Sequence, residues 1–138
     1  MKPVVQLETS GCGIASAAAI TGVSYPKMKS VANGLGIFAE DQKLWSNTSY
    51  VRRLLKHFGF RTGSREVPFR SWEALPPFAL LSIKWHREKG TPCWHWVVFV
   101  REKGNSYVLD PKRKLKTHRR TDFGRMKPKW YIPVHQKT

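Results

Sequence analysis

Cys12 is the residue of this sequence with the clearest chemical potential, because it lies between Gly11 and Gly13 at the start of an alanine-rich run. That run, Cys12 to Thr21, predicts a helix that ends at Gly22. A thiol in the first turn of a helix lies near unpaired backbone amides and the positive end of the helix dipole, and both favour the thiolate. The position predicts a cysteine nucleophile. The alternative is a small buried residue in an apolar helix.

A cysteine nucleophile requires a base, and His95 is the polar residue within the apolar strand predicted at 94–100. Asp110 follows the next predicted strand, 106–109, and the intervening Glu102-Lys103-Gly104-Asn105 predicts a hairpin turn. Antiparallel pairing brings the start of one strand beside the end of the other, so Asp110 can orient the imidazole. The alternative for His95 is a core histidine whose hydrogen bonds are satisfied.

Gln6 lies six residues before Cys12, in a segment too irregular to be a helix. Its side-chain NH2 group could meet the backbone N–H of Cys12 at the place where a substrate carbonyl oxygen becomes negative. Gln6 is therefore a candidate oxyanion donor. The alternative is an ordinary surface glutamine.

Three segments together resemble the bacteriocin-processing (double-glycine leader) peptidases. The run Gln6–Ala15 resembles their Q-x5-C-G-x-A opening, and His95-Trp96-Val97-Val98 and Val108-Leu109-Asp110-Pro111 resemble their H-[FW]-V-V and V-L-D-P segments. The resemblance covers about residues 4–111. It implies a papain-like α+β fold, with Cys12 as nucleophile, His95 as base, Asp110 as the residue that orients it and Gln6 as oxyanion donor. Most members of the family are domains of a transporter, whereas a stand-alone domain is expected here.

The order of predicted elements agrees with that fold class. Further helices are expected at 26–33 and 48–58, and strands at 78–83, 94–100, 106–109 and 130–134. Helices that precede an antiparallel sheet define an α+β protein, here with the cysteine on the helices and the His and Asp on the sheet. We expect a single domain, 1–138. Residues 34–47 and 84–93, which contain Trp45 and Trp85, are expected to be loops around the cleft.

Charge is the unusual part of the composition. The 138 residues carry 25 Lys and Arg against 9 Asp and Glu, a net charge of +16, while 41% hydrophobic and 12% aromatic residues exclude a disordered chain. The segment 111–138 alone holds ten basic side chains and one acidic one. Acidic partners are expected. An acidic peptide is one, and nucleic acid is another, bound through Lys112, Arg113, Lys114, Lys116, Arg119 and Arg120.

Cysteine usage and hydropathy set the remaining expectations. Two cysteines do not make a disulfide framework, so a reducing compartment is expected, and a Cys12–Cys93 bridge would act as a redox lock on the site. Cys93 and His95 lack the second close ligand pair of a zinc site, and neither a metal nor another cofactor is expected. The sequence has neither a signal peptide nor an apolar run that spans a bilayer. A cytoplasmic protein is expected, with a secreted effector as the alternative.

The leading hypothesis is thus a cysteine hydrolase, a peptidase that cleaves a peptide or related acyl bond through a thiolate–imidazole pair. Two alternatives remain open. The same three residues would serve acyl transfer to an amine, and a papain-like scaffold with this basic segment would also serve a module that binds or cleaves nucleic acid.

Overall fold

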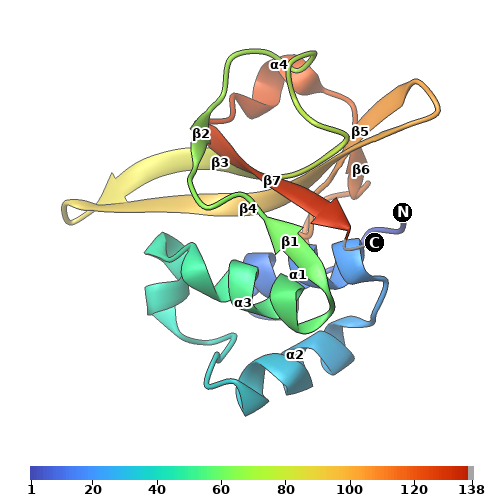
Figure 1. Ribbon diagram of the computed structural model, residues 1–138. Coiled ribbons are helices and arrows are strands. Elements are labelled where there is room, and N and C mark those ends of the chain that lie inside the picture. The colour runs from blue at the N-terminus through green and yellow to red at the C-terminus, as the bar shows by residue number, and fades with distance from the viewer. Residues whose placement is uncertain (137–138) are drawn as a thin grey trace.

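The computed structural model describes residues 1–136, and a seven-stranded antiparallel sheet forms its centre (Figure 1). Neighbouring strands follow the order β1-β7-β3-β4-β5-β6, and β2 pairs with β7. The strands are β1 (Phe60–Thr62), β2 (Val67–Pro68), β3 (Phe78–Glu88), β4 (Thr91–Glu102), β5 (Asn105–Leu109), β6 (Arg119–Arg120) and β7 (Trp130–Gln136).

Helices cover both faces of the sheet. On one face lie three helices, α1 (Cys12–Thr21), α2 (Tyr25–Gly34) and α3 (Ser49–His57), with the short 3₁₀ helix η1 (Gln42–Ser46) before α3 (Figure 1). On the other lies α4 (Phe123–Met126), beside the loop that precedes β3. The order of helices and sheet confirms the predicted α+β class.

The alternating side chains of β4 divide the interior into two cores. Trp96, Val98 and Val100 face α1, whereas Val97 and Phe99 face the core beneath α4. This is the two-sided burial that a continuous apolar strand predicts. Every residue of α1 except the last is buried, and its small side chains let the helix backbone lie close to β4. The helix that carries Cys12 is thereby packed directly against the strand that carries His95.

The boundaries of two predicted elements follow from local turn chemistry. Helix α1 begins and ends where the sequence predicts, because Gly22 adopts a left-handed φ of 77° and donates a hydrogen bond to the carbonyl of Ala18. At the β4–β5 turn, Lys103 and Gly104 have φ values of 50° and 81°, as a two-residue hairpin with type I′ geometry requires. The hairpin that brings Asp110 back toward His95 is therefore formed as predicted.

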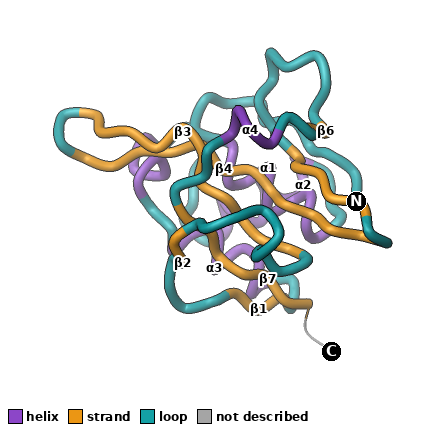
Figure 2. The backbone as a smooth tube through the Cα atoms, turned by 90° about the horizontal axis from the view of Figure 1, so that it is seen from above, coloured by secondary structure: helices purple, strands orange, loops and turns teal. Residues whose placement is uncertain are grey.

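The prediction of a loop at 84–93 is wrong. Residues 84–88 and 91–93 continue β3 and β4 as a hairpin that extends past the rest of the sheet, as Figure 2 shows. Lys89 and Gly90 form its turn, with φ values of 50° and 83°. Sequence reasoning missed this extension because most of its side chains are polar and exposed. No regular apolar alternation marks it, and backbone pairing does not require one. Of the other expected loop, 34–47, η1 occupies the last third.

The C-terminal segment belongs to the sheet. The predicted strand at 130–134 corresponds to β7, which runs to Gln136 between β1 and β3. β6 adds an edge strand beside β5. Residues 137–138 of the predicted basic segment lie outside the described residues. Within residues 1–136, no helix combines the length and the apolar character that a membrane crossing requires.

Candidate active site

Cys12 is the first residue of α1 and lies almost entirely inside the protein, with 8% of its surface exposed. Gly11 precedes the helix and supplies no side-chain hydrogen bond to the first turn. The first amides of the helix therefore have no capping side chain and can stabilise an anion. The backbone N–H of Trp96 also points at the thiol, 3.4 Å from Sγ. The sulfur thus lies at the start of α1 and accepts a backbone hydrogen bond from β4.

The glycines on either side of Cys12 are required by packing. A methyl group at Gly13 would overlap the ring of the buried Tyr50, and one at Gly11 would overlap the hydroxyl of Tyr25. Tyr50 lies on α3 and Tyr25 on α2. Small residues at these two positions therefore let the two neighbouring helices fix the start of α1.

His95 and Asp110 form a hydrogen-bonded pair. Nε2 of His95 lies 2.7 Å from Oδ1 of Asp110, and 14% of the histidine side chain is exposed against none of the aspartate side chain. Strand pairing explains the contact, because Val98 lies opposite Leu109 at the end of β5 and the chain then continues toward His95. With Nε2 bound to the carboxylate, Nδ1 is the ring nitrogen left for the thiol.

The electrostatics of the pair favour its charged form. Burial opposes protonation of His95, but hydrogen bonds to Asp110 and Cys12 and the charges of both raise its pKa to about 9. Burial also works against the Asp110 carboxylate, yet hydrogen bonds from His95, the backbone of Lys112 and Arg120, together with the charge of His95, lower its pKa to about 2. An imidazolium held in this way stabilises a thiolate beside it.

Arg120 is a site residue that sequence reasoning missed, since it was assigned only to the basic segment. Its Nη1 lies 2.9 Å from Oδ2 of Asp110, and its Nε and Nη2 lie 2.9 and 2.7 Å from the two carboxylate oxygens of Asp122. Oδ1 of Asp110 accepts from His95 and from the backbone of Lys112, at 3.0 Å in the latter case. Both oxygens of the buried carboxylate are therefore satisfied. No local pattern signals this contact, which depends on β6 pairing with β5.

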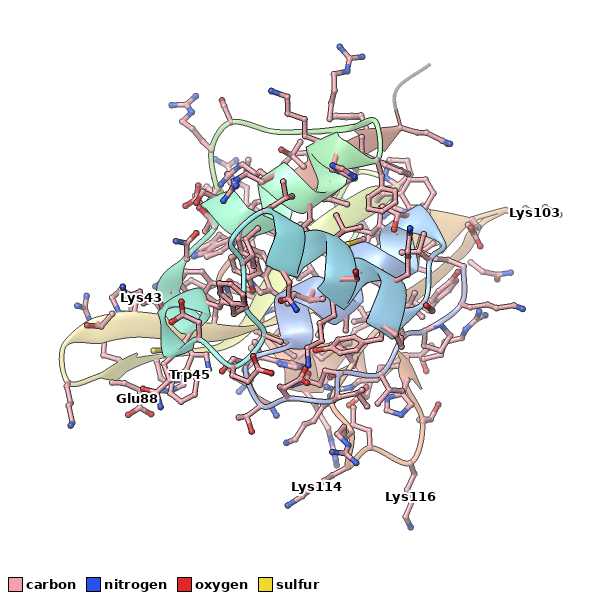
Figure 3. All side chains as sticks on the ribbon, turned by 90° about the horizontal axis from the view of Figure 1, so that it is seen from below. Lys43, Trp45, Glu88, Lys103, Lys114 and Lys116 are labelled. Carbon is pink, nitrogen blue, oxygen red and sulfur yellow. The ribbon has the colours of Figure 1, made fainter. Side chains whose placement is uncertain are left out.

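Other members of the basic segment also contact the chain itself. Arg119 donates to a backbone carbonyl at the N-terminus at 3.0 Å, and Arg113 to one in the loop before α1 at 3.3 Å. Lys114 and Lys116 extend outward from their loop (Figure 3). Since Arg113, Arg119 and Arg120 hold protein groups, half of the six residues predicted to contact phosphates are already engaged in the fold.

Gln6 is buried beside the site, with 7% of its surface exposed. Its backbone N–H donates to the carbonyl of Pro111 at 3.0 Å, next to Asp110. Its side-chain Nε2 donates to the carbonyls of Glu8 and Thr9, at 2.8 and 3.1 Å. In this structure the side chain therefore organises the loop that leads to the helix. The oxyanion role stays a prediction, because a substrate oxygen must compete with these two carbonyls.

Two open grooves meet at His95. The first, the thiol groove, has a volume of about 270 Å³ and is lined in part by Cys12, Trp45 and Trp94. Trp45 is fixed there by a hydrogen bond of 2.7 Å from its indole N–H to Ser10, and it lies on the same side of the molecule as Glu88 of the β3–β4 hairpin (Figure 3). Trp85, in contrast, packs beneath the cationic groups of Arg87 and Lys129.

The second groove, which we call the cationic groove, has a volume of about 740 Å³. Its basic side chains are Lys84, Lys112, Arg113 and Lys114, and Gln6 and His95 form part of its wall. The two grooves share Thr9, Lys84 and His95. A chain that ran through both would pass directly over the imidazole.

The described residues contain no group of three His, Cys, Asp or Glu side chains arranged to hold a metal ion. Cys12 and Cys93 are both free, buried thiols. The groups gathered at the site are a thiol, an imidazole, a carboxylate and a backbone donor.

The chain matches no family model and no curated protein sequence. Two solved structures share its fold. A double-glycine motif protease from an AMS/PCAT transporter, crystallised in complex with the leader peptide, is 18% identical with a TM-score of 0.64, and the alignment covers 99% of this chain and 91% of that one. The peptidase domain of Streptococcus ComA, a bifunctional ABC transporter of a quorum-sensing pathway, is 18% identical with a TM-score of 0.62, covering 99% and 98%. The described residues therefore have the papain-like fold of these neighbours.

Proposed function

We propose that this chain is a cysteine peptidase in which Cys12 is the nucleophile, His95 the acid–base group and Asp110 the residue that orients the imidazole. The observation that carries the proposal is the 2.7 Å hydrogen bond between His95 and a buried Asp110, at the head of the helix that begins with Cys12. The fold shared with two peptidase domains supports a peptide as substrate.

The proposed reaction begins with a thiolate–imidazolium pair. The Cys12 sulfur attacks the carbonyl carbon of a peptide bond, a C–S bond forms, and the carbonyl electron pair moves to oxygen. The backbone N–H at the start of α1 faces the resulting oxyanion, and we propose that Gln6 joins it by exchanging one loop carbonyl for this oxygen. The backbone donor is held by the fold before substrate binds, which is what makes such stabilisation effective.

The carbonyl then re-forms as the C–N bond breaks. His95 gives its proton to the leaving amine, and a thioester to Cys12 remains. Water next loses a proton to His95 and attacks the thioester, which releases the carboxylic acid and restores the thiolate and imidazolium. Asp110 keeps Nε2 of the ring protonated throughout, so that Nδ1 is the nitrogen that exchanges protons.

Thiol alkylation tests the pairing of Cys12 with His95, and the chain supplies its own control. Cys12 and Cys93 are both buried, with 8% and 5% of their surfaces exposed. We expect iodoacetamide near neutral pH to modify Cys12 much faster than Cys93, as measured by mass spectrometry of each peptide. The reason is that Cys12 lies at a helix start and contacts the imidazole that Asp110 holds. In a His95→Gln variant this preference should fall at least tenfold. Equal rates at the two cysteines in the native protein would refute the thiolate assignment.

Peptide substrates test the activity itself. The first peptide to test is a leader peptide that ends in two glycines, because one of the two structural neighbours is a double-glycine motif protease in complex with the leader peptide. If the native protein cleaves after the glycine pair and a Cys12→Ala variant does not, the result supports leader processing. Cleavage of other peptides by the native protein, with none at glycine pairs, supports a peptidase of different specificity.

A further inference from the structure

The cationic groove beside His95 has more positive charge than the fold uses. Within residues 1–136, none of its four basic side chains forms an ion pair with a carboxylate. The ammonium groups of Lys84 and Lys112 lie next to each other, and this contact, with burial, lowers the pKa of Lys84. Two like charges held side by side, with no carboxylate of the described residues in ion-pair contact, form an arrangement that an anion would stabilise.

The carboxylates near this groove are committed to other partners. Glu8 binds Lys29 at 2.6 Å through one oxygen and the hydroxyl of Tyr25 through the other. Asp110 uses both oxygens within the site, as described above. Glu88, which lines the thiol groove, pairs with His86 at 3.0 Å. No carboxylate of residues 1–136 is therefore in ion-pair contact with Lys84 or Lys112, and both remain open to an anion that binds in the groove.

The position of Lys84 requires an unfavourable backbone conformation. Lys84 has a φ of 54°, a left-handed value that is uncommon for a residue other than glycine. It lies in an irregularity of the β3–β4 ladder, which pairs Ile83 with His95 and then resumes with His86 opposite Cys93. Bulges of this kind redirect side chains and occur next to active sites. The same bulge makes Lys84 the basic residue shared by both grooves.

We propose that the cationic groove binds a carboxylate of the peptide substrate, close to the bond that is cleaved, with Lys84 and Lys112 as its binding pair. The carboxylate is an acidic side chain or the C-terminus of a short peptide. The inference rests on the proposed peptidase function and specifies its substrate class: the excess charge of the groove selects peptides that are anionic near the scissile bond.

Two alkylating reagents test the charge at Cys12 without a known substrate. Iodoacetate is an anion and iodoacetamide is neutral, so the ratio of their rates at Cys12 reports the local positive charge. In a Lys84→Gln/Lys112→Gln variant we expect this ratio to fall about fivefold at low ionic strength, an effect that salt diminishes. A Lys27→Gln/Lys56→Gln variant removes the same net charge from exposed helix positions and should leave the ratio as it is.

The two proposals fail in different ways in this experiment. If iodoacetamide modifies Cys12 no faster than Cys93, the thiolate assignment fails and the groove's role in catalysis fails with it. If Cys12 is reactive but the ratio is the same with and without Lys84 and Lys112, only the cationic groove is refuted. Each lysine is also replaced singly, and circular dichroism confirms that every variant is folded, so that a misfolded double variant does not decide the result.

Digestion of a mixed peptide library identifies the source of the carboxylate. We expect Asp or Glu within about three residues of the cleaved bonds more often than in the library as a whole, and we expect this preference to disappear in the Lys84→Gln/Lys112→Gln variant. Cleavage confined to bonds near peptide C-termini would identify the terminal carboxylate instead. The absence of either preference in the native protein would overturn the proposal.

Discussion

Arg120 forms an ion pair with the buried Asp110, with 2.9 Å between Nη1 and Oδ2, and this contact joins the basic C-terminal segment to the candidate active site. The aspartate side chain is fully buried and its other oxygen accepts from His95. Arg120 thus fixes the carboxylate of Asp110, which in turn orients the imidazole of His95. It touches no reacting atom, so we regard it as a positioning residue.

Replacement of Arg120 by Met should lower kcat roughly ten- to a hundredfold, because a small displacement of a catalytic group has an effect of that size. It should also lower the free energy of unfolding by about 3 kcal/mol, since a buried carboxylate loses a partner. The hydrogen bond from Arg120 helps to lower the pKa of Asp110. The acid limb of the activity profile should therefore move to higher pH.

Arg120→Lys and Arg70→Gln are the controls for this prediction. Lysine keeps the charge but lacks the planar group that reaches Asp110 and Asp122 together, so it should restore activity only in part. Arg70 is exposed, and its replacement should alter neither kcat nor the pH profile. A profile for Arg120→Met that coincides with that of the native protein would leave Arg120 with a purely structural role.

The raised pKa of His95 predicts how activity and stability respond to alkaline pH. Burial alone would lower this pKa, but the hydrogen bonds and charges of Asp110 and Cys12 raise it from 6.5 to about 9. The contribution of the charged imidazole to stability is thus present in full below about pH 6.5 and is lost as the pH rises through 9. Peptide hydrolysis should fall over the upper part of the same range, because the leaving amine then finds no proton on His95.

NMR of protein with labelled histidine checks this directly, with the His95 signal assigned from a His95→Gln variant. We expect the His95 signal to titrate near pH 9 in the native protein. In Asp110→Asn the midpoint of this titration should move to lower pH, because the carboxylate charge is gone. A native His95 that titrates near 6.5 would show that the ion pair with Asp110 does not govern the site.

Two glycines at α-helices predict opposite effects of the same substitution. Gly13→Ala should lower the free energy of unfolding by about 2 kcal/mol or more, because the added methyl overlaps the buried ring of Tyr50. Gly34→Ala, at the end of α2, should raise it by about 0.5 kcal/mol, since the methyl meets no atom within 4 Å and alanine favours the helix. Thermal or urea unfolding of both variants measures this. Equal effects would mean that Tyr50 does not constrain the start of α1.

Local signals made much of this fold predictable. Helix α1 was found because glycines mark both its ends around an alanine-rich run, and the β4–β5 hairpin because Lys103-Gly104 suits a tight turn. That hairpin also made the proximity of His95 and Asp110 predictable, since antiparallel pairing relates their positions. The sequence pattern therefore anticipated that His95 and Asp110 lie side by side, although not the distance between them.

The parts that were missed depend on contacts between distant residues or on exposed backbone pairing. Most side chains of the β3–β4 extension are polar, so its strands carry no regular hydrophobic pattern. Arg120 reaches Asp110 only because β6 joins the sheet, and a two-residue strand of arginines has no recognisable signal. For Gln6, the carbonyls of Glu8 and Thr9 could not be seen as its partners until the loop was folded.

The most direct test of the central claim is digestion of a mixed peptide library in H₂¹⁸O by the native protein and by Cys12→Ala, with the products identified by mass spectrometry. We predict new C-termini that carry ¹⁸O with the native protein and none with Cys12→Ala. Such products would show that water resolves an acyl group on Cys12. Products joined to amines would reveal acyl transfer instead, and labelled products that persist in Cys12→Ala would contradict the assignment of Cys12 as the nucleophile.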